Sequence, residues 1–127
     1  MIKLALLAAC GGAIGAAGRY LVGVGATRAF GIDFPWGTLI VNVVGSLAMG
    51  LLIGWFALRL TGSESLRVFL AIGVLGGFTT FSAFSMDVVF LIERKAQGLA
   101  FLYAGTSVVL SVAALFVGLY LARQGLR

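Results

Sequence analysis

Four long apolar stretches restrict this chain to one solvent and one class of fold. They cover roughly residues 4–25, 37–58, 68–92 and 98–122 of the 127-residue sequence, in which 61% of residues are hydrophobic and 10% are charged. A helix needs about 20 apolar residues to cross the hydrocarbon core of a bilayer. A soluble domain of this length could not bury so much apolar surface. We therefore expect an all-α membrane protein with four transmembrane helices, embedded in a lipid bilayer.

The segments between these stretches are short and carry turn and interface residues. The first contains Pro35 and Trp36, the second Gly62 and Glu64, and the third the run 93–95, Glu-Arg-Lys. Proline suits the start of a helix, and tryptophan suits the level of the lipid headgroups. No hydrophilic segment is long enough to form a soluble catalytic domain. The sequence therefore predicts a single domain over residues 1–127.

The net charge of +5 does not indicate a nucleic-acid partner. The charges fall in short clusters between apolar stretches and form no basic face, which favours contact with phospholipid headgroups. The chain has no histidine and one cysteine, Cys10, so an intramolecular disulfide and a cysteine–histidine zinc site are excluded. We expect Cys10 to be a small buried apolar side chain.

The distribution of positive charge between the two sides of the membrane leaves the orientation open. With four spans, both termini and the second loop share one side, which carries five positive charges. The opposite side carries three, or four if Arg19 is counted there. Either this small bias suffices to set one orientation, or the chain inserts both ways and pairs with an inverted copy of itself. The residues counted are Lys3, Arg59, Arg67, Arg123 and Arg127 against Arg28, Arg94 and Lys95.

Arg19 and Asn42 are costly residues inside the predicted spans. Arg19 either extends to the interface or faces a water-filled vestibule, and the glycines at 11, 12, 15 and 18 allow close helix approach around it. Asn42 must either hydrogen-bond to a neighbouring helix or line a polar path. Ser46 follows it one turn later on the same face.

The fourth stretch carries a hydroxyl stripe, and the third carries an acid. Tyr103, Ser107 and Ser111 recur every four residues and so share one helix face. The serines either bond to carbonyls of their own helix or form a polar track. Asp87 is the one acid clearly inside a predicted span.

The run "GGFTTFSAF", residues 77–85, predicts that the third helix is broken near mid-membrane. Gly73, Gly76 and Gly77 precede two threonines, Thr79 and Thr80. Such a break survives only inside protein or beside a polar cavity, and its freed carbonyls are ligands for a small cation. Beyond it, residues Phe81 and Phe84 share one face. They either pack as ordinary aromatics or offer their electropositive ring edges to a small anion.

Three segments, "GGAIGAAGRY", "WGTLIVNVVGSLAMG" and "GVLGGFTTFSAF", together resemble the signature segments of the Fluc (CrcB-like) fluoride channels. The resemblance covers essentially the whole chain, and the ordered set is highly specific. It implies a fluoride-selective channel of the bacterial inner membrane that lets fluoride leave the cytoplasm passively and so lowers its toxicity. It also implies an antiparallel, dual-topology homodimer with two pores and a structural sodium ion at the dimer centre.

The resemblance also implies roles for individual residues. Arg19 matches the vestibule arginine of the family, and Gly76 and Thr79 match the positions whose backbone carbonyls hold sodium. Two positions depart from the pattern: Ala83 replaces the usual threonine, and Asp87 replaces an expected glutamate. The residues that match the pore and its fluoride-binding positions are Asn42, Phe81, Ser82, Phe84, Tyr103, Ser107 and Ser111.

Other classes of protein fit the sequence less well. A small dual-topology multidrug exporter is the main alternative, but its proton exchange needs a membrane-embedded acid, and the first, second and fourth spans contain none. An enzyme is disfavoured because there is no nucleophile–base pair and the acids are scattered. A purely structural subunit or a lysis protein would not require a broken helix together with Asn42 and the hydroxyl stripe.

Overall fold

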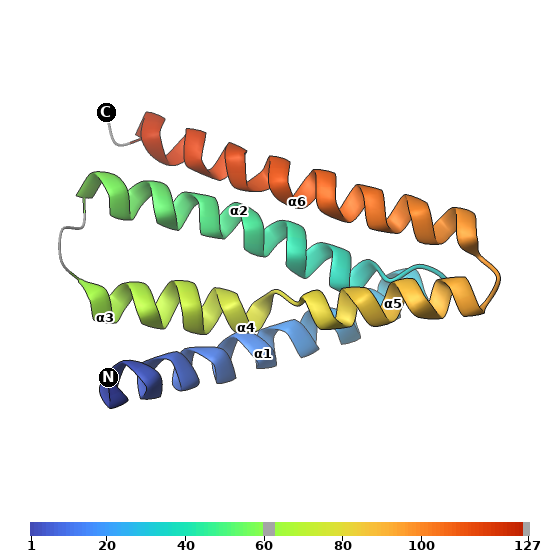
Figure 1. The fold of residues 1–127 in the computed structure, drawn as a ribbon, viewed down its shortest axis with the longest axis horizontal. Helices are drawn as coiled ribbons and strands as arrows, with labels where there is room; N and C mark the ends of the chain where they lie inside the picture. The colour runs from blue at the N-terminus through green and yellow to red at the C-terminus, as the bar shows by residue number, and fades with distance from the viewer. Residues whose placement is uncertain (60–62, 126–127) are drawn as a thin grey trace.

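The computed structural model describes residues 1–59 and 63–125, which form four membrane-length helical spans (Figure 1). The predicted all-α fold with four spans is confirmed. The helices run past the apolar windows, because a helix satisfies its own backbone groups as well in the headgroup region as in hydrocarbon. The elements are α1 Ile2–Phe30, α2 Trp36–Arg59, α3 Glu64–Arg67, η1 Val68–Leu75, α4 Gly76–Phe78, α5 Phe81–Glu93 and α6 Gln97–Gly125.

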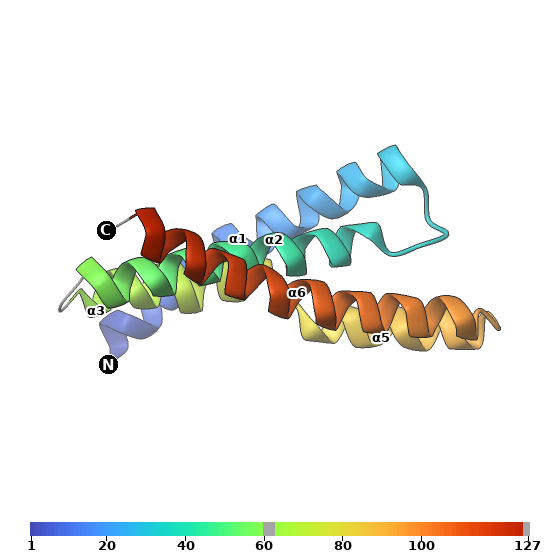
Figure 2. The same ribbon diagram turned by 90° about the horizontal axis from the view of Figure 1, so that it is seen from above.

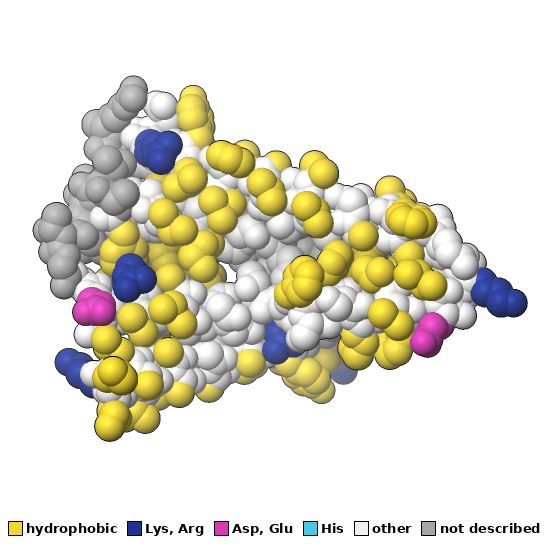
Figure 3. All heavy atoms as spheres, viewed as in Figure 1, with side chains coloured by type: hydrophobic (Ala, Val, Ile, Leu, Met, Phe, Trp, Pro, Cys, Tyr) yellow, Lys and Arg dark blue, Asp and Glu magenta, His cyan; other side chains and the backbone are white. Residues whose placement is uncertain are grey.

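The four spans alternate in direction, so both ends of the described chain and the start of α3 lie at the same end of the bundle (Figure 1). Charged side chains lie mainly towards the two ends, and hydrophobic side chains are spread along the face between them (Figure 3). Many large apolar side chains are exposed, including Phe101 at 77% and Phe116 at 67%. This distribution is the one expected for a protein whose flanks face lipid.

The third span consists of two half-helices that pack against different neighbours. Its first half, η1 and α4, packs mainly on α1, whereas its second half, α5, packs on α6. Figure 2 shows this exchange: α1 lies beside the third span at one end of the bundle and diverges at the other, where α5 and α6 run together. α2 packs chiefly along α6. The break therefore lets one span join α1 to the rest of the bundle.

Glycines permit the close packing of α1 against the first half of the third span. A Cβ atom on Gly11 would lie 2.9 Å from the Cα of Gly73, and one on Gly77 would lie 2.6 Å from the carbonyl oxygen of Gly12. Gly15 is equally tight, with the amide nitrogen of Phe78 at 2.7 Å from such an atom. The predicted close approach around the α1 glycines is thus confirmed. Hydrogen side chains are required here because the two backbones are in contact.

The core of the isolated chain is small. Among the described residues, Leu39, Leu91, Ala100 and Tyr103 form a cluster of buried side chains, at the end where α5 passes into α6. The prediction of a buried Cys10 is wrong, since its side chain is exposed. α1 uses its glycines for helix contact, and Cys10 lies off that face, where lipid or a partner can cover it.

Candidate functional site

The third span is broken at Thr79 and Thr80, as predicted. Thr79 has φ −83° and ψ 159°, and Thr80 has φ −154° and ψ 123°, so both backbones are extended between α4 and α5. Thr80 also begins α5, because its hydroxyl accepts a hydrogen bond from the amide of Ala83 at 3.0 Å. Thr79 closes α4 with its own hydroxyl, which donates to the carbonyl of Leu75 at 3.0 Å.

Asn42 of α2 hydrogen-bonds to the backbone of the break. Its Nδ2 donates to the carbonyl of Thr80 at 3.0 Å, and its Oδ1 accepts from the amide of Thr80 at 2.8 Å. The Oδ1 atom replaces the acceptor that the amide of Thr80 would have in a continuous helix. The Nδ2 group adds a donor to the carbonyl of Thr80, which as the N-cap of α5 also accepts the first bond of that helix. The interpretation that Asn42 hydrogen-bonds to a neighbouring helix is confirmed. Asn42 also lines a groove, described below, and its role in a polar path stays a prediction.

Arg19 of α1 reaches the other side of the break. Its Nε donates to the carbonyl of Gly77 at 3.2 Å, and the side chain is half-buried. Arg19 also borders a hollow of about 690 Å³ between the diverging ends of α1 and α2. We call it the vestibule hollow, although the vestibule role of Arg19 stays a prediction. Its lining includes Arg19, Tyr20, Thr27, Arg28, Thr38, Thr80 and Ala83.

A groove of about 350 Å³ runs between α2, the break and α6. It brings together six predicted pore or cation residues from α2, the break, α5 and α6, and none of the residues that line it is charged. Its walls combine hydroxyl and amide groups with aromatic rings, all electrically neutral. The lining residues are Asn42, Gly45, Ser46, Met49, Thr79, Thr80, Phe81, Phe84, Ser107, Val108, Ser111, Val112 and Leu115.

Phe81 and Phe84 border this groove just beyond the break. Their ring centroids lie 5.6 Å apart with the planes tilted by 44°. Phe84 in turn contacts the ring of Tyr103, with centroids 5.2 Å apart. Phe81 is 78% exposed in the isolated chain, whereas Phe84 is half-buried. The two rings therefore differ in packing: Phe84 packs between Phe81 and Tyr103, whereas most of the Phe81 ring is left uncovered by its own chain.

The hydroxyl stripe of α6 divides into two parts. Ser107 and Ser111 line the groove, and the buried hydroxyl of Ser107 has no hydrogen-bond partner within the described part of the chain. Tyr103 is fully buried, lies outside the groove lining, and donates from its hydroxyl to Asp87 Oδ2 at 3.0 Å. Ser82 is exposed beside the hydroxyl of Thr80, at 3.3 Å, and does not line the groove either.

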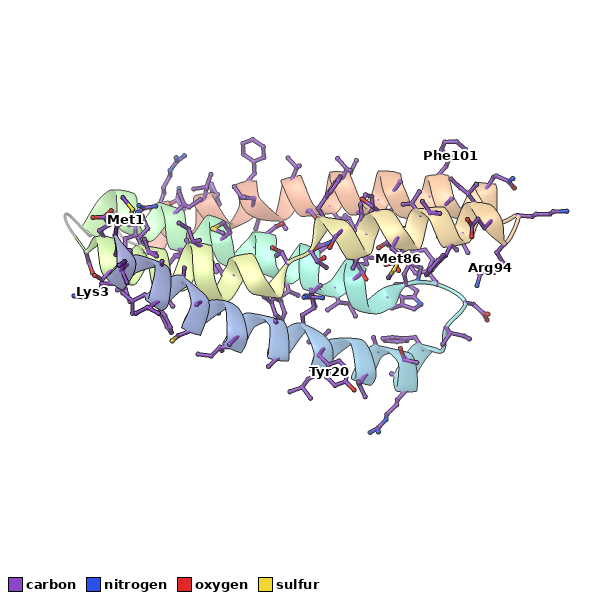
Figure 4. The ribbon with its side chains drawn as sticks, turned by 60° about the horizontal axis from the view of Figure 1, so that its bottom comes forward. Met1, Lys3, Tyr20, Met86, Arg94 and Phe101 are labelled. Atoms are coloured by element: carbon purple, nitrogen blue, oxygen red, sulfur yellow. The ribbon has the colours of Figure 1, made fainter. Side chains whose placement is uncertain are left out.

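The two departures from the family pattern lie in different places. Asp87 is half-buried next to Tyr103 and borders a small cavity, which it shares with Asp33 and Arg94. Arg94 lies at the end of the bundle near the loop before α2 (Figure 4), where it donates to the backbone carbonyl of Asp33 at 2.7 Å. Ala83 lines the vestibule hollow rather than the groove of the phenylalanines.

The carbonyls of Gly76 and Thr79 lack the donors that a continuous helix would provide. The amide of Thr80 is diverted to Asn42, and the amide of Ala83 is diverted to the hydroxyl of Thr80. Within residues 1–59 and 63–125, no other donor reaches these two oxygens. Carbonyls from unwound helix are common ligands of sodium in membrane proteins, so the donor set fits this ion. The described residues contain no cluster of three acidic, histidine or cysteine side chains as an alternative.

Comparison with known proteins decides the family. The family described as CrcB-like protein, Camphor Resistance (CrcB), matches residues 6–119. The chain belongs to this family. It is 56% identical over 125 residues to the "Fluoride-specific ion channel FluC" of Caulobacter sp. (strain K31), covering 98% of this chain and 97% of that protein. It is 57% identical over 124 residues to the protein of the same name from Agrobacterium fabrum, covering 98% of both. The predicted family is confirmed.

Sequence reasoning did not identify Thr80 as a central residue of the site. Its backbone is the partner of Asn42, its hydroxyl caps α5, and its side chain borders both the groove and the vestibule hollow. The signal was present in the sequence, since a threonine directly before an apolar helical run is a common N-cap. Only the packing of α2 against the break reveals that Asn42 is its partner.

Proposed function

We propose that this CrcB-family chain forms a fluoride-selective channel through which fluoride leaves the cytoplasm passively. The observation that carries the proposal is the groove between apolar helices. Its lining is uncharged and includes hydroxyl groups, one amide and two phenylalanine rings. The curated relatives named as fluoride-specific ion channels support the same function at 56% and 57% identity. A channel has no need of a catalytic group.

Fluoride is small and strongly hydrated, so a selective path must replace its water with protein donors. Asn42 uses one of its two N–H bonds on Thr80 and keeps the second. The unpartnered hydroxyl of Ser107 and the hydroxyl of Ser111 follow along α6. The electropositive ring edges of Phe81 and Phe84 attract an anion without a fixed charge that would trap it. Several weak sites in series allow both entry and exit.

The working unit in this proposal is an antiparallel homodimer in the bacterial inner membrane. Phe81 is 78% exposed and Gly76 is exposed, although both lie at the centre of the functional region. A second, inverted copy would cover them and close the groove, and the near balance of positive charge permits both orientations. Homo-oligomers with two-fold symmetry are the commonest arrangement for such a self-complementary surface.

A sodium ion at the dimer centre completes the proposal. Gly76 and Thr79 of each subunit would hold it through backbone carbonyls, for which residues 1–59 and 63–125 supply no competing donor. Bound sodium would neutralise the partial negative charge at the C-terminal ends of the two α4 segments. The side chains of this region then act by shaping the backbone.

Fluoride efflux from liposomes that contain the purified protein tests the function. We expect fluoride to leave passively, with chloride retained under the same gradient. Equal leakage of the two halides would refute the selectivity. A multidrug exporter would instead exchange protons for a cationic drug, a reaction that this groove, with no acidic side chain in its lining, does not support.

A further inference from the structure

The break leaves several backbone groups to be satisfied at mid-membrane, where an unpaired group costs several kcal/mol. Two side chains from other helices take over two of them: Asn42 accepts from the amide of Thr80, and Arg19 donates to the carbonyl of Gly77. Asn42 also donates to the carbonyl of Thr80, the N-cap of α5. Thr80 caps the next helix with its own hydroxyl. This division of partners leaves the carbonyls of Gly76 and Thr79 free.

The bond from Asn42 excludes helix continuation at this point. In an unbroken helix the amide of Thr80 would donate to the carbonyl of Gly76. Here it donates to Asn42 Oδ1 at 2.8 Å, and the adjoining bond from Nδ2 orients the whole peptide group. Restoring the helix would break both bonds and leave the Asn42 amide half-buried without a partner.

Arg19 acts at the C-terminal end of α4. The end of a helix carries partial negative charge on its last carbonyls, and a guanidinium donor there is favoured by both charge and hydrogen bonding. The glycine contacts of α1 set the position of Arg19 relative to the break, because Gly15, one turn before Arg19, packs against the backbone of Val74 and Phe78. Gly18 lies against the ring of Phe78, and a Cβ atom added to Gly18 would lie 3.5 Å from that ring. Arg19 is therefore held at Gly77 by packing.

We propose that Asn42 and Arg19 are positioning residues that hold the third span open at Thr79 and Thr80, and thereby keep the Gly76 and Thr79 carbonyls available to a cation. In this proposal Arg19 acts chiefly through its hydrogen bond to Gly77 and only secondarily as a positive charge in the vestibule. The proposal rests on the proposed function where it concerns sodium and fluoride, but the state of the break can be measured independently of both.

Hydrogen–deuterium exchange on the full-length protein measures the break directly. We expect Asn42→Leu to speed exchange in the 79–83 segment by about tenfold or more, the effect of losing one buried amide hydrogen bond. Arg19→Leu, which has no donor for the Gly77 carbonyl, should loosen the same segment. Ser46→Ala is the control for Asn42, since Ser46 faces the same groove one turn later and makes no bond to the break. Unchanged exchange in both Asn42→Leu and Arg19→Leu would overturn the proposal.

The ionic-strength dependence of fluoride flux separates the two possible roles of Arg19. Attraction of anions by a charge is screened, since the Debye length falls from about 30 Å at 0.01 M salt to about 3 Å at 1 M. Arg28→Leu is the matched control, because Arg28 lines the same hollow without bonding to the break. We expect Arg19→Leu to lower flux about tenfold or more at both salt concentrations, because the bond to Gly77 is lost at both. The effect of Arg28→Leu should disappear at high salt.

Sodium supplies the last measurement. We expect the Arg19→Leu and Asn42→Leu proteins to need about tenfold more sodium for the same protection against heat, read as retained dimer on size exclusion. If the loss of flux in Arg19→Leu disappeared at high salt, as in Arg28→Leu, Arg19 would be an anion attractor and the proposal would fail. If the parent protein did not conduct fluoride at all, the proposed function would fail while the exchange experiment would still decide the role of both residues.

Discussion

Asn42 donates one N–H to the Thr80 carbonyl and retains another, and Ser107 presents a buried hydroxyl with no partner in the described chain. Unused donors are unusual inside proteins, because each costs free energy unless something binds to it. Both lie in the wall of one uncharged groove. At the scale of single residues, the groove wall therefore contains donors without a partner, as the proposed fluoride path requires.

The role of the phenylalanine ring edges can be tested by replacing each ring with an apolar side chain that keeps most of its bulk. We expect Phe81→Ile and Phe84→Ile each to reduce fluoride flux by about tenfold or more, because isoleucine has no quadrupole. The dimer should still form. The control is Phe101→Ile, since Phe101 is 77% exposed and projects outward from α6 (Figure 4). Flux equal to that of the parent in both groove variants would assign the phenylalanines to packing.

The hydroxyl of Ser107 should oppose stability and support conduction. Ser107→Ala removes an unpartnered buried polar group, so we expect the free energy of unfolding to stay the same or rise by about 1 kcal/mol. Fluoride flux should fall, though less than for the phenylalanine variants, because Ser111 and Asn42 still line the groove. Thermal unfolding in detergent and liposome efflux measure the two effects. A loss of stability without a loss of flux would contradict this role.

At the scale of helices, α1 packs on the third span through direct backbone contacts at glycines rather than through interdigitated side chains. Gly15 is a decisive position, since a Cβ there would lie 2.7 Å from the amide nitrogen of Phe78. Because α4 ends at Phe78, the same contact sets the distance from α1 to the break. The shape of the site thus depends on helix packing one turn away from it.

Gly15→Ala should therefore separate α1 from α4. We expect it to destabilise the protein by about 1–3 kcal/mol, the usual effect of overpacking a tight contact. The matched control is Gly25→Ala on the same helix, whose Cβ would meet nothing within 4 Å. Thermal unfolding in detergent measures both variants. Equal stabilities of the two would show that α1 can shift to accommodate the added methyl group.

For the whole molecule, the isolated chain leaves its functional centre partly uncovered. Gly76 and Phe81 are exposed next to the break, while α6 and α1 present apolar flanks suited to lipid. A second, inverted copy over the break would bury these groups and bring two sets of Gly76 and Thr79 carbonyls together. This arrangement predicts that the chain inserts in both orientations.

Cysteine labelling of vesicles tests the inverted dimer. The variant Gln124→Cys, in a Cys10→Ser background, places one thiol in the exposed end of α6. We expect a membrane-impermeant reagent to label about half of the chains from outside sealed vesicles, and the rest only after permeabilisation. Complete labelling from one side would show a single orientation and exclude the inverted dimer.

The sequence by itself determined the solvent, the four spans, the family and the position of the break. Each of these depends on local composition: apolar runs of membrane length, and glycines and threonines that cannot continue a helix in lipid. The residue types of the site were also predictable, because an amide or an arginine inside an apolar helix is costly and needs a reason.

Only the tertiary structure decided which of these residues meet. Asn42 and Thr80 are 38 positions apart in the chain, and Arg19 and Gly77 are 58 apart, so no local pattern could pair them. Tyr103 and Ser107 share a helix face, yet Tyr103 is buried against Asp87 while Ser107 borders the groove. The difference arises because α5 packs over the turn of α6 that carries Tyr103, whereas the next turn, with Ser107, lies beside the break. Such choices depend on where a neighbouring helix begins and ends, which is a property of the packed bundle.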